Sequence, residues 1–145
     1  MDIKRNESTL NRPEGDRVLD APFVHNDLGD FIKQLKNEKA WDKNDRNGIT
    51  IFKTDELATV ITCLQKGAEI KDNEVDGLVV LQVLDGKVKV IFDGADEKKI
   101  RENEMITIHA NVRHTIHASK DCAILLHVIS CSKPGVSNYS TIGIP

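Results

Sequence analysis

The sequence predicts an all-β protein built from antiparallel strands, with one helix near the N-terminus. From residue 49 onward, short runs rich in β-branched residues alternate with turn residues, which is the pattern of a sandwich or barrel. The chain of 145 residues, 39% of them hydrophobic, suits one domain with a sizeable core. The runs predicted to be strands are Ile49–Lys53, Leu57–Leu64, Leu78–Leu84, Lys87–Phe92, Met105–His109, His114–Ala118 and Cys122–Ser130.

The region before the strands divides into two parts. Residues 1–20 are mostly polar and include Pro13 and Gly15, so we expect an N-terminal arm. Residues 21–48 are expected to form a helix and a linker packed on the barrel. Between Asp27 and Glu38 apolar residues recur at three- and four-residue steps, which indicates one amphipathic helix with Asn26 or Asp27 as its cap. The apolar positions are Leu28, Phe31, Ile32 and Leu35.

Residues 49–132 are expected to form the barrel, and residues 133–145 a C-terminal tail. Within the barrel, the step Asp85-Gly86 lies between two apolar runs and predicts a two-residue type I′ hairpin. Side chains alternate across a strand, so the expected pairing places one apolar set on the inner face and leaves Lys87 and Lys89 on the wetter face. The inward set is Val79, Leu81, Val83, Val88, Val90 and Phe92.

The charge balance gives no support for binding to extended polyanions. The formal net charge is −3, so neither a nucleic acid nor an anionic membrane surface is an expected partner. No apolar run reaches the length of a membrane span, and the N-terminus has no apolar stretch typical of a signal peptide. The three cysteines form no CxxC pair, which favours reduced thiols and a cytoplasmic location. Cys63 and Cys122 lie in apolar runs and are expected in the core.

Two segments resemble the paired motifs of the cupin superfamily. The first motif reads G-x5-H-x-H-x3-4-E-x6-G, and Gly67 and Gly86 occupy its glycine positions. The second reads G-x5-P-x-G-x2-H-x3-N, and its histidine falls on His114. The resemblance covers roughly residues 49–129 and implies an antiparallel jelly-roll β-barrel with the N-terminal helix outside. The second motif departs from the family at Asn103, His109, Asn111 and Ala118.

The resemblance also implies where metal ligands would lie. The ligand positions of the first motif fall on Asn73, Val75 and Val79. Valine cannot bind a cation, and one imidazole with one amide oxygen falls short of the three ligands that a catalytic metal needs. We therefore expect no metal and no other cofactor. His109 and His117 lie near His114 in sequence, but strand alternation turns His117 to the opposite face.

A pocket lined by His114, Asn73, Val75 and Val79 is the candidate site, and His114 is its weak candidate for catalysis. An imidazole exchanges protons near neutral pH and can act as an acid or base. Polar groups on an apolar wall are typical of a small-molecule site. The structural alternative, given equal weight, is that Asn73 and His114 bond to each other or to buried water.

Three functions remain open from the sequence. The leading one is a metal-free cupin-like protein that binds a small molecule or serves in sensing or as a scaffold. The second is a metal-independent epimerase or isomerase that uses His114. The third is a metal-dependent dioxygenase or isomerase with unrecognised ligands. The family resemblance also implies a homodimer, and fold alone does not choose among the activities.

Overall fold

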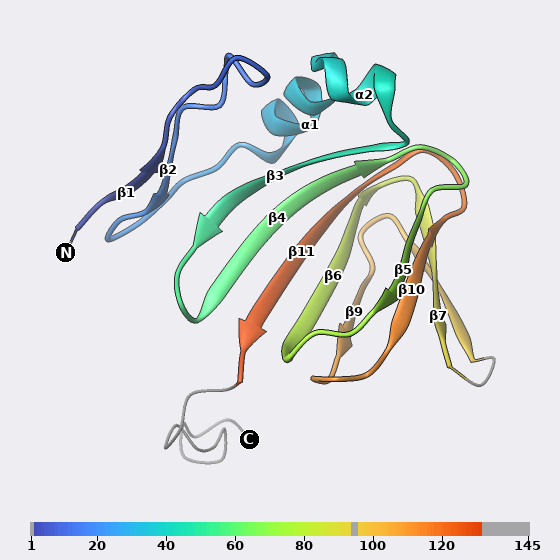
Figure 1. Cartoon of the computed structure of the whole chain (residues 1–145). Helices are drawn as coiled ribbons and strands as arrows, with labels where there is room; N and C mark the ends of the chain where they lie inside the picture. The colour runs from blue at the N-terminus through green and yellow to red at the C-terminus, as the bar shows by residue number, and fades with distance from the viewer. Residues whose placement is uncertain (1, 94–95, 132–145) are drawn as a thin grey trace.

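The computed structural model describes residues 2–93 and 96–131, so the expected tail of residues 133–145 lies outside the described residues. Two antiparallel sheets face each other (Figure 1), which is the predicted all-β architecture. One sheet has the order β3-β4-β11-β6-β9, with bounds Arg46–Lys53, Leu57–Leu64, Cys122–Ser130, Gly77–Asp85 and Met105–Ile108. The other has the order β5-β10-β7-β8, with bounds Glu69–Asn73, His114–Ala118, Lys87–Phe92 and Glu97–Arg101.

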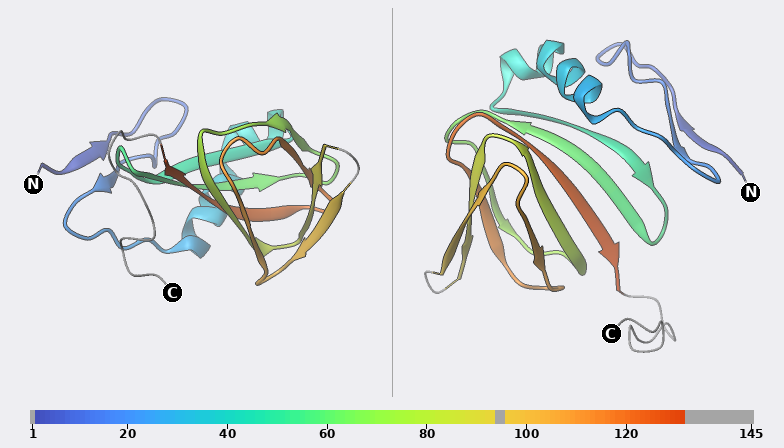
Figure 2. Two further views of the ribbon diagram at one scale, coloured as in Figure 1. Left: turned by 90° about the horizontal axis from the view of Figure 1, so that it is seen from below. Right: turned by 180° about the vertical axis from the view of Figure 1, so that it is seen from behind.

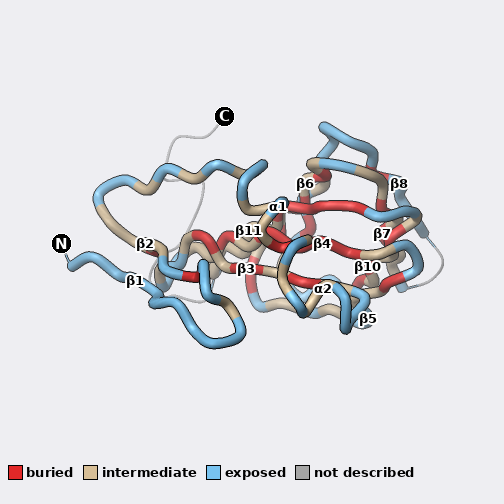
Figure 3. Tube along the Cα trace, turned by 90° about the horizontal axis from the view of Figure 1, so that it is seen from above, coloured by how far each residue is buried: buried red, intermediate tan, exposed pale blue. Residues whose placement is uncertain are grey.

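The main core lies between the two sheets. Alternate residues of β6 and β7 are buried while their neighbours are partly exposed, as the period of two along a strand requires. Figure 3 shows the buried stretches running along the strands, whereas the N-terminal arm is largely exposed. The buried apolar side chains of this core are Leu64, Ala68, Val79, Leu81, Val83, Val88, Val90, Ile100, Ile108, Ile116, Ala118, Cys122 and Ile124.

A second apolar cluster joins the helices to the outer face of the five-stranded sheet. Helix α1 (Leu28–Asn37) begins at Asp27, whose carboxylate accepts the Asp30 amide at 3.0 Å, so the predicted cap is confirmed. Its apolar stripe buries Leu35 completely. A second helix, α2 (Lys39–Lys43), places Trp41 against the same cluster. The buried members are Leu35, Ile49, Ile51, Ile61, Cys63, Ala123 and Leu125.

The N-terminal arm contains a short pair of strands that crosses beside the five-stranded sheet (Figure 2). Strand β1 (Lys4–Asn6) pairs with β2 (Arg17–Asp20), and β2 lies next to β3 without pairing to it. Neither these strands nor α2 was predicted. The charged strands β5 and β8 were also missed, because sequences such as Glu97–Arg101 carry almost no apolar alternation.

The predicted type I′ hairpin at Asp85-Gly86 is wrong. Strand β6 pairs with β9 and β11, whereas β7 pairs with β8 and β10, so the chain crosses between sheets at Gly86. Gly86 has a φ of +85°, and Asp85 does not share this left-handed conformation. The predicted faces are nevertheless correct for Val79 and Val88, which are 2% and 0% exposed, because both sheets turn their inner faces toward the same core.

Gly86 is required at the crossing for two reasons: its backbone has a positive φ, and neighbouring backbone atoms leave no room for a side chain. Comparing variants at Gly86 and Gly67 distinguishes the two effects. At Gly86 an added Cβ would lie 2.3 Å from the Asp121 carbonyl oxygen. At Gly67 φ is also positive, +89°, but nothing lies within 4 Å. We expect Gly67→Ala to lower the free energy of unfolding by about 1–2 kcal/mol, the cost of a left-handed residue.

Gly86→Ala adds the clash with Asp121 to the cost of the left-handed backbone. We expect this variant to lower the free energy of unfolding by at least about 3 kcal/mol. Urea denaturation of both variants measures the difference. Equal losses in the two variants would show that the close approach to Asp121 contributes nothing.

Candidate functional site

His114 is the first residue of β10 and points into the barrel. Its neighbours on the same face, Ile116 and Ala118, are fully buried, and His114 itself is 1% exposed. Across the sheet it lies opposite Phe92 on β7 and Asn73 on β5. The ring centroids of His114 and Phe92 are 6.4 Å apart. The predicted inward orientation of His114 is thus confirmed.

Two hydrogen bonds fix the protonation of the neutral His114 ring. Nδ1 lies 2.9 Å from the Val112 carbonyl oxygen, which can only accept, so Nδ1 carries the proton. Nε2 is then an acceptor, and it lies 3.3 Å from the Asn73 side-chain amide nitrogen. The bond between Asn73 and His114 that the sequence left open is therefore formed. Both partners of His114 are uncharged.

The two valines of the candidate pocket belong to the apolar wall. Val79 is 2% exposed and lies within the main core, and Val75 packs against the same core while remaining partly exposed. The backbone carbonyl of Val75 accepts the Asn111 amide at 2.8 Å, which ties this segment to the loop before His114. The structure thus joins Asn73 to His114 and places Val79 in the main core, with Val75 packed against that core.

Four of the motif positions have a left-handed backbone. Asn103 and Asn111 replace the two glycines of the second motif, and both have positive φ, +69° and +62°. Gly67 and Gly86 of the first motif also have positive φ. Asparagine is among the few residues that adopt this conformation readily, so it can replace glycine without changing the turn. Asn103 and Asn111 therefore adopt the left-handed conformation that a glycine at the same positions would readily adopt.

A metal ion does not fit the side chains at the ligand positions. Asn73 and His114 supply one amide and one imidazole, and the valines supply no donor atom. Within residues 2–93 and 96–131, no three His, Cys, Asp or Glu side chains are grouped so that they could hold an ion. No step that needs a metal can be derived from these residues.

Two further histidines and the two core cysteines have surroundings of their own. His117 is on the outer face and contacts the Glu69 carboxylate at 3.2 Å. His127 contacts the Thr59 hydroxyl at 2.9 Å, and burial lowers its pKa, so its ring has a hydrogen-bond partner within the sheet. Burial raises the pKa of the Cys63 thiol to about 11 and that of Cys122 to about 12. Both cysteines are buried core residues, as predicted.

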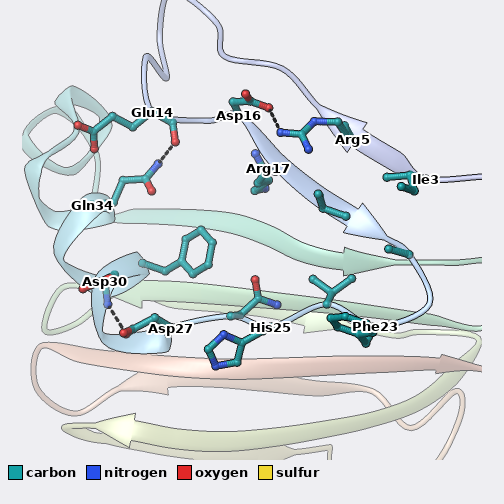
Figure 4. Close-up of a pocket in the computed structure, with 15 residues that line it drawn as sticks. Ile3, Arg5, Glu14, Asp16, Arg17, Phe23, His25, Asp27, Asp30 and Gln34 are labelled. Carbon is teal, nitrogen blue, oxygen red and sulfur yellow. Dashed lines mark hydrogen bonds and ion pairs between the residues drawn. The ribbon is translucent and has the colours of Figure 1, made fainter.

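A cavity of about 550 Å³ that the sequence did not predict lies between the arm and α1 (Figure 4). Its volume is in the range of small-molecule sites. Phe23 and His25 line its lower side, and Phe31 and Arg17 also contribute to its wall. None of the four predicted pocket residues lines it. No local pattern could reveal it, because the arm and helix form it only by lying side by side.

Side chains of the arm cover the open edge of β3. Arg12 Nη2 donates to the Gly48 carbonyl at 2.9 Å, and Arg17 Nε donates to the Thr50 carbonyl at 2.6 Å. An uncovered edge strand invites pairing with another chain. Arg12 also pairs with Glu38, whose side chain is 9% exposed. These contacts hold the arm over the sheet and so form the cavity.

The strand order and the inward histidine define a cupin-type jelly roll, and solved structures share this fold. A conserved protein of unknown function from Streptococcus pyogenes matches with a TM-score of 0.64 and 19% identity, over 79% of this chain and 96% of that one. A RmlC-like cupin from Desulfovibrio desulfuricans matches with a TM-score of 0.59 and 15% identity, over 75% and 97%.

A cupin-2 domain protein from Shewanella frigidimarina matches with a TM-score of 0.58 and 16% identity, over 72% of this chain and 93% of that one. At such identities the likeness shows the fold alone. No family profile matches the sequence, and no curated protein sequence matches it. None of the helices in the described part of the chain has the length and apolar character needed to cross a membrane.

The ion pair between Arg12 and Glu38 predicts that the arm is held less firmly at low pH. Burial opposes ionisation of Glu38, but hydrogen bonds from Gln34, Asn47 and Arg12, with the charge of Arg12, lower its pKa overall. Because the pKa of Glu38 is lower in the folded protein than in the unfolded chain, where it is about 4.3, the carboxylate stabilises the fold at pH values above about 4.3. This stabilisation is lost as the pH falls through the pKa that Glu38 has in the folded protein.

We expect Glu38→Gln to lower the free energy of unfolding by about 1–3 kcal/mol at pH 7, since hydrogen bonds to a charged group are lost. The loss should shrink when denaturation is repeated below pH 4. Glu14→Gln, the same change at an exposed position on the arm, is the matched control and should stay within about 0.5 kcal/mol. A penalty for Glu38→Gln that is the same at both pH values would contradict the role of the carboxylate.

Proposed function

We propose that this cupin-like protein binds a small molecule at the Asn73–His114 pair without a metal ion, in a sensing or scaffold role. The observation that supports the proposal is the hydrogen bond between these side chains inside an apolar wall. Asn73 is partly exposed whereas His114 is buried. A ligand would therefore reach Asn73 first and His114 only by replacing their mutual bond.

The two polar groups restrict the chemistry of such a ligand. With Nδ1 held by Val112, the Nε2 atom of His114 needs a donor, and the Asn73 amide offers both a donor and an acceptor. Phe92 lies beside the His114 ring, and Val75 packs against the main core. A small neutral molecule with adjacent hydroxyl, amide or carbonyl groups satisfies these requirements better than an anion, because neither Asn73 nor His114 in its neutral form carries a positive charge.

The enzyme alternatives have weaker support. An epimerase or isomerase that used His114 as acid or base needs a second catalytic group, and within the described part of the chain the polar partners of His114 are a backbone carbonyl and a side-chain amide. Metal-dependent dioxygenase or isomerase chemistry lacks a ligand set at the motif positions. The homodimer, the cytoplasmic location and the absence of cofactors stay predictions.

Two measurements on untagged protein, purified without chelators or a nickel column, test the proposal. Elemental mass spectrometry should find far less than one transition-metal ion per chain. A fragment screen by NMR should yield small polar molecules that shift the Asn73 and His114 signals. Asn73→Ala should abolish those shifts, whereas Phe23→Ala, which changes only the arm cavity, should leave them unchanged.

Near-stoichiometric metal would overturn the metal-free proposal. Fragments that shift only residues of the arm cavity would move the site there. The triple variant Asn73→His/Val75→His/Val79→Glu checks the alignment independently: it should gain about one ion per chain, because His114 then completes a four-ligand set. Adding His114→Ala to this variant should weaken that binding.

A further inference from the structure

The outer face of strands β7 and β8 carries four basic side chains, which we call the basic face. They are Lys87, Lys89, Lys99 and Arg101. The register places Lys87 directly opposite Arg101 and Lys89 directly opposite Lys99. The residues between them point inward and are buried, so strand alternation turns all four cations to the same outer surface.

This arrangement opposes like charges at the closest positions of the strand pair. The Lys87 carbonyl accepts the Ser119 amide, so the Lys87 backbone faces β10 and not β8. Lys87 and Arg101 therefore form a non-hydrogen-bonded pair, in which the side chains lie closer. Like charges directly opposite each other destabilise a sheet. The basic face thus carries a cost that a fold needing only a soluble surface would avoid.

Carboxylates within the structure relieve little of this charge. Glu97 contacts Lys89 at 3.6 Å, and Glu69, at the far end of the same row, is engaged by His117 and Lys71. Among the described residues no carboxylate forms an ion pair with the other three cations of the basic face. The chain has a net charge of −3, so this positive surface is local and opposite in sign to the whole protein.

We propose that the basic face binds a short acidic segment of a partner protein. A longer polyanion fits less well, because the exposed carboxylates Asp93, Asp96 and Glu102 flank the two strands along the chain and the whole chain is negative. The face carries no aromatic side chain on which nucleic-acid bases could stack. Its apolar content is limited to the partly exposed Ile91, which is too little to insert into a bilayer.

The edge of β8 favours an extended partner. Strand β8 ends the four-stranded sheet, and among the described residues the hydrogen bonds on its open side join Arg101 to Glu104. An extended segment beside Glu97–Lys99 could therefore continue the sheet. Side chains two residues apart on such a segment share a face. Carboxylates at alternate positions would then match Lys99 and Arg101, which are also two residues apart.

Fluorescence anisotropy with labelled octapeptides tests this proposal. The first probe has glutamate at alternate positions, and the second has the same composition with the glutamates contiguous. We expect the alternating peptide to bind more tightly, and its affinity to fall as salt is raised from about 20 to 150 mM. The variant Lys87→Gln/Lys99→Gln/Arg101→Gln should bind at least tenfold more weakly.

The matched control is Lys39→Gln/Lys43→Gln/Lys53→Gln, which removes the same charge from exposed positions elsewhere and should stay within twofold of the parent. Equal losses in both triple variants, or no peptide binding at millimolar concentration, would overturn the proposal. Tighter binding of duplex DNA or of phosphatidylserine vesicles than of either peptide would also overturn it.

A single charge reversal adds a second readout, the melting temperature, which does not depend on the choice of peptide. Lys99→Glu replaces a like-charge pair with an opposite-charge pair opposite Lys89. We expect the melting temperature to rise by about 1–4 °C while peptide binding is lost. A variant that is less stable and still binds would contradict both the cost assigned to the basic face and its role.

Discussion

The apolar contact between the two sheets is the interaction on which the rest of the structure depends. Val79 and Leu81 of β6 meet Val88 and Val90 of β7 in one buried cluster. Burial of each such side chain contributes roughly 1.5–3 kcal/mol, so the barrel can be held closed by aliphatic packing. The position where the cupin motif has a carboxylate is part of this contact. A charged side chain at Val79 would need a metal or another cation to offset its desolvation.

His114 is a buried polar side chain in this otherwise aliphatic interior, and it therefore needs hydrogen-bond partners. A buried imidazole must find partners for both nitrogens, and Val112 and Asn73 supply them. The inward orientation of His114 was predictable because strand alternation does not depend on which strand lies next to it. The hydrogen-bonding state of His114 was not, because Asn73 meets it only across β5 and β10. Asn103 and Asn111 are departures from the motif in sequence, and both have the positive φ that glycine adopts readily.

Features set by the pattern of a single strand could be predicted, whereas features set by which segments lie side by side could not. Apolar alternation fixes the faces of Leu78–Leu84 and Lys87–Phe92 whatever their partners are, so those faces were correct. The Asp-Gly signal at Gly86 indicates a sharp reversal but not whether the chain returns to the same sheet. In the structure Gly86 packs against the backbone of Asp121 and Cys122, and the chain continues into the other sheet. The charged strands β5 and β8 carry no such signal. The arm cavity was beyond prediction, since its walls come from segments without a shared pattern.

The two sheets protect their open edges in different ways, and this difference limits how the barrel can associate. At β3 the carbonyls of Gly48 and Thr50 are engaged by guanidinium groups of the arm, so a new strand would first have to displace the arm. At β8 the protection comes mainly from charge, a device that repels other edges but attracts a carboxylate-bearing segment. Association through β3 would therefore require the arm to move. Association through β8 requires only a partner of the opposite charge.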